Sequence, residues 1–236
     1  MIRKILRKIY IISKVYKIII YFYSIIGKGV KESDETIMIP MDLINSCIDN
    51  EKSDKYRFYK NDFKFRKIGS IESGDWDLVL LPINQLPTIK LFYDRFVKKM
   101  KWEDTQYYKN LKFKIQKNGK RRGCSSITEY YEKNFMQWDK VYLNIKENGY
   151  KSQLELGNSS LYEIEICISR NGDIIFIDGR HRLSIAKILN IREIPVVVNM
   201  WHSDFIRLFK KNNMHLEINN KNLMKYLFDY HAKEEK

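Results

Sequence analysis

The sequence predicts a mixed α+β fold, and three observations support that prediction. The chain of 236 residues is 44% hydrophobic and has only ten glycines and four prolines, which is typical of a folded protein. Its final third alternates between strand-like and helix-like hydrophobic patterns, and several other segments have apolar residues three and four positions apart. A chain of this length can bury one sizeable core. We therefore expect one domain over residues 36–236, with its centre at 160–200.

The first 30 residues are predicted to form a basic amphipathic helix. Residues 1–31 contain eight Lys or Arg and no Asp or Glu, and apolar residues recur at helical spacing. The uninterrupted apolar run at 18–23 is much shorter than the roughly 20 residues that a membrane span needs. Three interpretations stay open: the helix lies on an anionic membrane surface, it packs on its own domain with its lysines solvated, or it anchors the chain as a single span with snorkelling lysines.

Between this helix and the final third, the pattern predicts short strands followed by helices. Residues 27–36 are expected to be a linker, 36–40 a strand that leads into a helix start, and 63–68 another strand. Apolar spacing predicts helices, including one in the C-terminal region, at 88–100, 102–112, 126–148 and 204–232.

The final third has the clearest pattern. Residues 160–169 alternate as a half-buried strand, Asn171-Gly172 predicts a turn, and residues 173–177 predict the second strand of a hairpin. A helical pattern starts at Arg180, and residues 194–198 return as a strand. A strand–helix–strand crossover would place the turn before Arg180 at the end of a strand and the start of a helix.

That turn, Asp178-Gly179-Arg180-His181-Arg182, is predicted to bind phosphate. The first N–H groups of a helix lack intrahelical partners and lie at the positive end of the helix dipole, so they attract anions. Gly179 allows positive φ or close backbone approach, and Arg180, His181 and Arg182 add donors and charge. Asp178 would cap the helix, orient a neighbouring side chain or hold Mg²⁺. The structural alternative is a capped helix with two surface arginines.

The segment 178–187, followed by Ile194-Pro195-Val196-Val197-Val198, resembles the nucleotide-binding core of the ParB/sulfiredoxin-like superfamily. That superfamily includes chromosome-partitioning CTP-binding proteins, sulfiredoxins and free serine kinases. The resemblance covers about 40 residues and implies a ParB/sulfiredoxin-like core with added helices.

Among these branches, the motif is most similar to the free serine kinases. Their aspartate, glycine, histidine and arginine match Asp178, Gly179, His181 and Arg182, whereas Arg180 departs from their pattern. Sulfiredoxins need a cysteine where Arg180 stands. Partitioning proteins carry a DNA-reading domain downstream, and only 38 residues follow Val198. The resemblance therefore implies a phosphotransferase that uses ATP or another nucleotide with Mg²⁺.

Two upstream segments, 72–77 and 101–107, resemble motifs of uncharacterised ParB-like proteins associated with surface-polysaccharide gene neighbourhoods. In the first, Asp75 and Asp77 flank Trp76 beside a glycine. Paired carboxylates suit Mg²⁺ binding or deprotonation of a substrate hydroxyl. The structural alternative is a turn with Trp76 in the core and both aspartates solvated.

The remaining signals bear on partners and compartment. Three separated cysteines without metal-ligand spacing favour a reducing cytoplasm, and Cys167 is expected to be a buried strand thiol. A basic patch surrounds the expected turn at Asn118-Gly119 and would serve a nucleic-acid-binding alternative. Its members are Lys112, Lys114, Lys117, Lys120, Arg121 and Arg122.

Taken together, these patterns favour a cytoplasmic nucleotide-dependent phosphotransferase with a hydroxyl acceptor, either a glycan or a lipid-linked molecule. In this hypothesis Asp75 or Asp77 deprotonates the acceptor, Asp75, Asp77 or Asp178 holds Mg²⁺, and His181 acts beside the phosphates. The N-terminal helix would bring the protein to the inner face of the membrane. Alternatives are a non-catalytic nucleotide-responsive module and a ParB-like DNA-binding or nuclease protein, with nucleic acid the less favoured partner.

Overall fold

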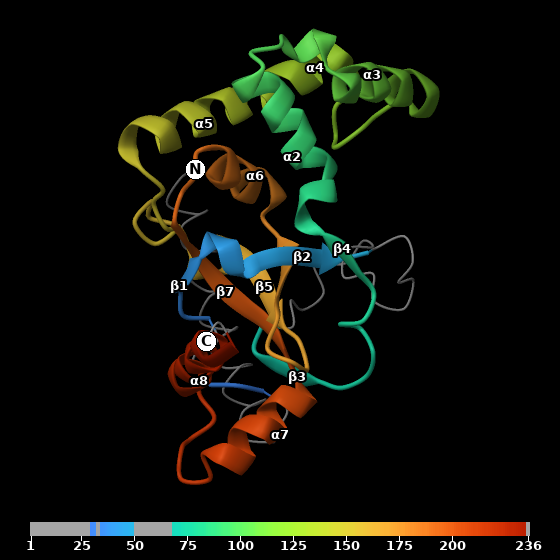
Figure 1. Cartoon of the computed structure of the whole chain (residues 1–236). Helices are drawn as coiled ribbons and strands as arrows, with labels where there is room; N and C mark the ends of the chain where they lie inside the picture. The colour runs from blue at the N-terminus through green and yellow to red at the C-terminus, as the bar shows by residue number, and fades with distance from the viewer. Residues whose placement is uncertain (1–28, 32–33, 50–67, 235–236) are drawn as a thin grey trace, which may run out of the picture. The chain divides into compact units, whose positions relative to one another are not determined.

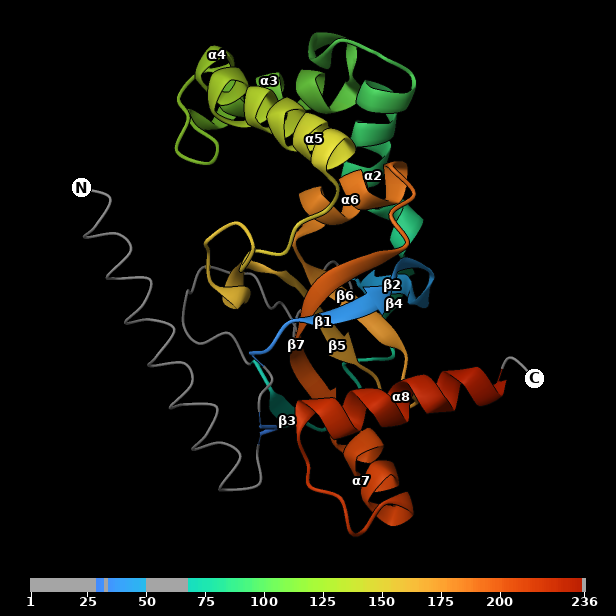
Figure 2. The same ribbon diagram turned by 90° about the vertical axis from the view of Figure 1, so that its left-hand side faces the viewer.

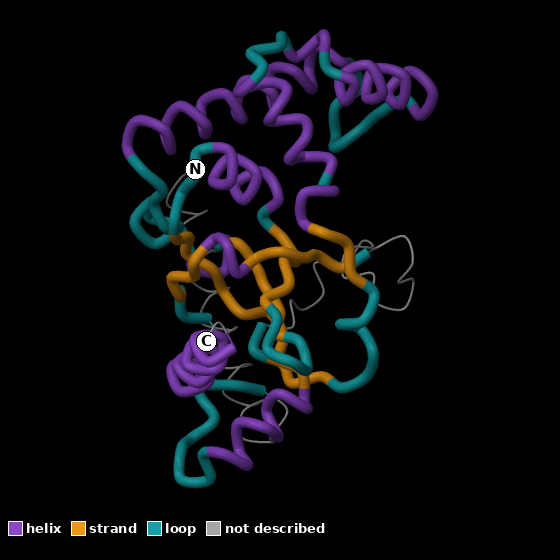
Figure 3. Tube along the Cα trace, viewed as in Figure 1, coloured by secondary structure: helices purple, strands orange, loops and turns teal. Residues whose placement is uncertain are grey.

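The computed structural model describes residues 29–31, 34–49 and 68–234 (Figure 1), and these form two compact units. Unit 1 comprises the chain up to residue 83 together with 152–179 and 193–236, and unit 2 comprises 84–151 and 180–192. The fold is mixed, with helices and a mixed sheet, as predicted (Figure 3).

Unit 1 is built on a seven-stranded sheet in the order β1-β7-β5-β6-β2-β4, with β3 also paired to β7. The pairing is antiparallel for β1–β7, β2–β4 and β5–β6, and parallel for β2–β6, β3–β7 and β5–β7. The strands are β1 (Ile37–Pro40), β2 (Ile44–Ile48), β3 (Ser70–Glu72), β4 (Leu80–Pro82), β5 (Ile164–Ile168), β6 (Ile174–Asp178) and β7 (Glu193–His202).

The expected hairpin is confirmed as β5 and β6, which enclose a turn with Gly172 at φ 88°. Residues 160–162 form a 3₁₀ turn, η7 (Ser160–Tyr162), so the strand starts later than predicted. Cys167 is completely buried in β5, as expected. The strand–helix–strand order is as predicted, with a helix at Arg180–Ile188 between β6 and β7. In the sheet, β5 lies between these two strands, and β7 runs antiparallel to β6.

Two helices, α7 (Ser203–Asn212) and α8 (Asn220–Glu234), pack together in unit 1 (Figure 2). Phe205 and Phe209 are fully buried in α7, and both rings contact Tyr226 of α8. One continuous helix over 204–232 had been expected. Helix α7 ends instead at Asn212, because Asn213 has a φ of −140°, which is not helical, and asparagine is a weak helix former.

The N-terminal predictions are only partly covered by the described residues. Residues 1–28 of the predicted helix at 1–30 and nearly all of the strand at 63–68 lie outside them. The strand at 36–40 is confirmed as β1, but the helix start after it is one 3₁₀ turn, η1 (Met41–Leu43), that leads into β2. Val30 is completely buried and Gly29 bridges to Ser70, so this part of the expected linker belongs to unit 1.

Unit 2 is helical, and the predicted helices are present with shifted ends. Thr105 caps α3 by accepting a hydrogen bond from the Tyr108 N–H, and Gly119 ends it at φ 76°, so this helix begins and ends later than expected. The elements are η3 (Ile83–Gln85) at the boundary, α2 (Pro87–Phe92), η4 (Tyr93–Val97), η5 (Trp102–Asp104), α3 (Gln106–Asn118), α4 (Ile127–Tyr130), η6 (Tyr131–Phe135), α5 (Met136–Asn148) and α6 (Arg180–Ile188).

An aromatic cluster forms the core of unit 2. Phe92, Trp102, Phe135 and Trp138 are buried with ring centroids 4.7 to 6.1 Å apart, mostly edge to face. Ile185 of α6 is fully buried in the same cluster. The segment 180–192 therefore completes the core of unit 2, although it lies far along the chain from the other members.

Candidate functional site

The predicted phosphate turn begins at the end of β6. Gly179 has φ 93°, and its N–H donates a 2.7 Å hydrogen bond to the Asp178 carboxylate. A Cβ at this position would lie 2.9 Å from Cγ1 of Ile164 and 3.1 Å from its Cα. Glycine is therefore required both by its conformation and by the close approach of β5. The expected positive φ is present, and the backbone that approaches Gly179 is part of the protein itself.

Helix α6 starts directly after Gly179. Leu183 and Ile185 are buried, while Arg180 and Arg182 in the first turn are partly exposed. The Ser184 hydroxyl donates to the Arg180 carbonyl at 2.7 Å and lies 3.1 Å from the Thr88 hydroxyl of α2. These contacts hold the start of α6 on α2, so its first N–H groups have a fixed direction.

His181 is held among aromatic rings. Its imidazole stacks on Trp138 with ring centroids 4.6 Å apart and an interplanar angle of 25°, and it lies 5.9 Å from Phe92. Burial, followed by the positive charges of Arg122 and Arg180, lowers the pKa of His181 to about 3. The ring is therefore neutral at neutral pH. The expectation that His181 adds positive charge for phosphate is wrong, because desolvation disfavours its protonated form.

Arg122 joins this region from the turn between α3 and α4. Its φ of 48° is unusual for a residue with a side chain, and it stands between Gly119 and Gly123, which also have positive φ. The positive charge of Arg122 is one of the causes that lower the pKa of His181, after burial. The sequence places Arg122 only in the basic patch, since nothing in its spacing connects it with residue 181.

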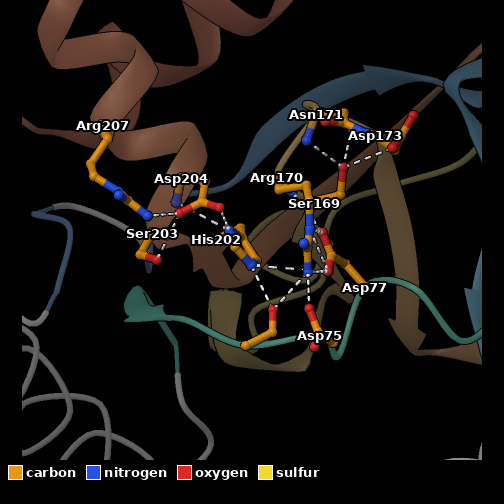
Figure 4. Close-up of polar contacts among 11 residues, drawn as sticks. Asp75, Asp77, Ser169, Arg170, Asn171, Asp173, His202, Ser203, Asp204 and Arg207 are labelled. Atoms are coloured by element: carbon orange, nitrogen blue, oxygen red, sulfur yellow. Dashed lines mark hydrogen bonds and ion pairs between the residues drawn. The ribbon is translucent and has the colours of Figure 1, made fainter.

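The Asp75 and Asp77 pair belongs to a different cluster, in unit 1. Asp77 is buried and accepts from the Arg170 backbone N–H at 2.8 Å and from its guanidinium at 2.7 to 3.1 Å. Arg170 also donates to the Gly74 carbonyl at 2.8 Å and to Asp75 at 2.9 Å (Figure 4). Burial would raise the pKa of Asp77, but the hydrogen bonds from Arg170 outweigh it and lower that pKa.

His202 completes this cluster from the end of β7. Its Nδ1 accepts from the Asp204 N–H at 3.1 Å and caps α7, so the neutral ring carries its proton on Nε2. That nitrogen lies 2.8 Å from the Gly74 carbonyl oxygen and donates to it. The Trp76 ring lies 5.6 Å from His202 and is buried. Both ring nitrogens are therefore engaged, Nδ1 in capping α7 and Nε2 in holding the 74–77 turn.

The β5–β6 hairpin lies between the Asp75 and Asp77 pair and Asp178. Arg170 follows β5 and holds Asp77 at the turn, whereas Asp178 pairs with Glu165 at the other end of the same hairpin. Four residue steps along a strand correspond to about 13 Å. One metal ion therefore cannot be shared by Asp77 and Asp178. Among the described residues, no group of three Asp, Glu, His or Cys side chains is arranged to hold a metal ion.

Comparisons with protein-family models, with curated proteins and with solved structures find no match to this chain. In the described part of the chain, every helix is too short or too polar to span a bilayer. All three cysteines are buried, and none forms a disulfide.

Proposed function

We propose that this protein binds a nucleotide through its phosphates at the start of α6 and transfers a phosphoryl group to a hydroxyl acceptor. The observation that carries the proposal is the start of α6, where Arg180 and Arg182 follow Gly179 and where the positive charges of Arg122 and Arg180 add to the lowering of the His181 pKa. Neither arginine forms an ion pair with a carboxylate in the described part of the chain. Two uncompensated guanidinium groups beside free helix N–H groups form a donor set for a phosphate ester.

The roles of the residues follow from their surroundings. Arg122, Arg180 and Arg182 supply charge and directed donors, and phosphoryl transfer depends mainly on such positioning and charge stabilisation. His181 fixes the first turn of α6 against Trp138 as a neutral ring. A group with a pKa of about 3 is too weak a base to deprotonate a hydroxyl, so we give it no proton-transfer role.

Mg²⁺ fits one of the predicted carboxylates. Nucleotide enzymes commonly hold this ion with one or two carboxylates together with the phosphates. Asp178 precedes the arginine-bearing turn by two residues and would hold the ion only together with the nucleotide, where Mg²⁺ neutralises phosphate charge. Asp77 does not fit, because both of its oxygens are engaged by Arg170. Asp75 and Asp77 are therefore left out of the proposed reaction.

A non-catalytic nucleotide-binding module is the second candidate, and the engagement of Asp77 favours it. The hydroxyl-deprotonating carboxylate expected from the sequence is committed to a structural ion pair. A bound nucleotide could then act by stabilising the start of α6 rather than by reacting. Both candidates share the same phosphate site and differ only in whether a phosphoryl group leaves the nucleotide.

Calorimetric titration of the full chain with ATP, ADP and CTP in the presence of Mg²⁺ tests the shared site. We expect Arg122→Ala and Arg180→Ala each to weaken binding at least tenfold, since a charged hydrogen bond contributes about 1.5–3 kcal/mol. Arg207→Ala is the matched control, because its exposed guanidinium pairs only with Asp204 on α7. If all three variants bind nucleotide as tightly as the wild type, the start of α6 is not the phosphate-binding site.

Transfer is measured separately, with γ-labelled ATP and mixtures of glycan and lipid-linked hydroxyl acceptors. Labelled acceptor that depends on Arg180 would support the phosphotransferase. Nucleotide binding that depends on both arginines, without any labelled product or ADP release, would favour the non-catalytic module.

A further inference from the structure

A second block of uncompensated charge lies in unit 2, apart from the N-terminal segment. Residues 105–128 contain seven basic residues and no acidic one. Outside this block and the basic N-terminus, acidic and basic residues nearly balance, so the two segments account for the net charge of +14. The seven are Lys109, Lys112, Lys114, Lys117, Lys120, Arg121 and Arg122.

Helix α3 places lysines on the same face as an exposed aromatic ring. Leu111 and Ile115 are buried and face the core of unit 2. At 100° per residue, Phe113 lies opposite the midpoint of that buried face, and 64% of its surface is exposed. Lys109 and Lys117 are each four residues from Phe113 and therefore share its face. The Phe113 ring is not part of the core of unit 2, so it is available to contact a ligand.

The lysines on this helix are not neutralised within the protein. No Asp or Glu in the described part of the chain forms an ion pair with any of the seven basic residues. Nearby lysines behave differently: Lys98 pairs with Asp94 at 2.9 Å, and Lys133 pairs with Glu129 at 2.6 Å. The basic block therefore keeps its whole charge for an external polyanion.

The end of α3 extends the basic surface on a fixed turn. Arg121 and Cys124 exchange two backbone hydrogen bonds of 2.9 Å each, and Cys124 is buried. Positive φ values at Gly119 and Arg122 set the direction of the chain through the turn. Arg121 and Arg122 are both exposed in this hydrogen-bonded turn. The basic surface therefore continues from α3 into the turn.

We propose that this surface, formed by α3 and the turn at 120–122, binds the backbone and bases of single-stranded nucleic acid. Lysines on both sides of the outward face match a chain of phosphates, and Phe113 offers a ring on which an unpaired base can stack. Gln106, Asn110 and Gln116 are also exposed and can hydrogen-bond to base edges. An interfacial membrane helix would need a broad apolar face, whereas this face carries one phenylalanine among amides and lysines.

The test is fluorescence anisotropy of labelled oligo(dT) and oligo(U), titrated with the full chain at several salt concentrations. We expect affinity to fall as salt rises. Replacing Lys109, Lys112, Lys114 and Lys117 together by Gln should lower affinity at least tenfold and reduce the salt slope by about 0.7 for each lost phosphate contact. Phe113→Ala should lower affinity at least fivefold for the single strand, with no effect on a duplex of equal length.

Lys210→Gln combined with Lys211→Gln is the control, because it removes two exposed charges from α7 in unit 1. The proposal fails if the quadruple α3 variant binds oligonucleotide as tightly as this control does. It also fails if Phe113→Ala leaves oligonucleotide binding intact but releases the protein from phosphatidylglycerol vesicles, which would identify a membrane-docking face.

Failure here and failure of the nucleotide site are distinguishable. The α3 variants retain Arg122 and Arg180, so ATP titration should be unchanged in them. Loss of oligonucleotide binding with normal ATP binding would support two separate activities.

Discussion

At the scale of single residues, position 181 has the environment that is most unlike its sequence context. Between two arginines, a histidine is expected to contribute charge, yet Trp138 and Phe92 enclose its ring and lower its pKa to about 3. No sequence pattern connects residue 181 with rings that lie more than forty positions away. The Arg-His-Arg motif was therefore predictable as a helix start, but the neutral state of its histidine was not.

This burial makes stability depend on pH in a defined direction. The folded-state pKa of His181 is about 3, below the unfolded value of about 6.5, so the unfolded chain binds the proton more readily. The contribution of neutral His181 to the free energy of unfolding is fully present above about pH 6.5 and is lost as pH falls toward 3. Between pH 7 and 5 we expect a loss of about 2 kcal/mol in the free energy of unfolding.

Urea denaturation of the wild type and His181→Phe at pH 5, 6 and 7 measures this effect. Phenylalanine keeps an aromatic ring beside Trp138 but cannot be protonated, so the variant should lose about 2 kcal/mol less than the wild type over this range. Parallel pH profiles for the two proteins would show that His181 is not buried as described.

Gly179 allows a second test at the residue scale. Gly179→Ala would force a side chain to φ 93° and place its Cβ 2.9 Å from Ile164, so we expect a loss of about 2–4 kcal/mol. Gly157→Ala provides the matched control, since Gly157 has φ 75° but nothing within 4 Å of the added Cβ. The cost at 179 should exceed that at 157 by at least about 1 kcal/mol in urea denaturation. Equal costs would indicate that β5 does not approach Gly179 closely.

At the scale of elements, the sequence predicted local structure well and long-range contacts poorly. Alternation and the Asn171-Gly172 turn were sufficient for the β5–β6 hairpin, because both signals lie within a few residues. The break between α7 and α8 was missed, since apolar spacing continues across it. The partner of Asp77 was also missed: Arg170 is 93 positions away, and charges carry no signal of pairing over such a separation.

The Asp77–Arg170 ion pair should therefore act as a structural clamp on that hairpin. Asp77→Asn leaves a partly buried guanidinium without its charged partner, and we expect a loss of about 2–3 kcal/mol at pH 7. Asp75→Asn is the control, because the Asp75 side chain is 76% exposed and should cost less than about 1 kcal/mol. Both variants should retain nucleotide binding, since neither residue lies in the proposed phosphate site.

The pH dependence of this clamp has a fixed sign. The folded-state pKa of Asp77 is lowered, so its contribution is present above the unfolded value of about 3.9 and is lost as pH falls through the folded value. The wild type should therefore approach the stability of Asp77→Asn only in acid below about pH 4. A nucleotide-binding defect in Asp77→Asn at normal stability would restore a functional role for this carboxylate.

At the scale of the whole molecule, the two units are linked by chain connectivity. The chain passes between them at residues 83–84, 151–152, 179–180 and 192–193. Helix α6 completes the aromatic core of unit 2 through Ile185, while its ends are joined to β6 and β7 of unit 1. If β6 and β7 unfolded, both ends of α6 would lose their attachment, and the chain would gain conformational entropy in that partly unfolded state. We therefore expect the two units to lose their structure cooperatively.

Native-state hydrogen exchange, followed by mass spectrometry, tests this cooperativity in Asp77→Asn. Under conditions where exchange reports opening equilibria, peptides from β5 and β6 and peptides from α5 should lose the same free energy of protection, about 2–3 kcal/mol. Asp75→Asn should leave both sets nearly unchanged. If exchange increases only in the β5–β6 peptides, the aromatic core of unit 2 survives without its strand anchors. The start of α6 would then keep its arginines in place even when the sheet opens.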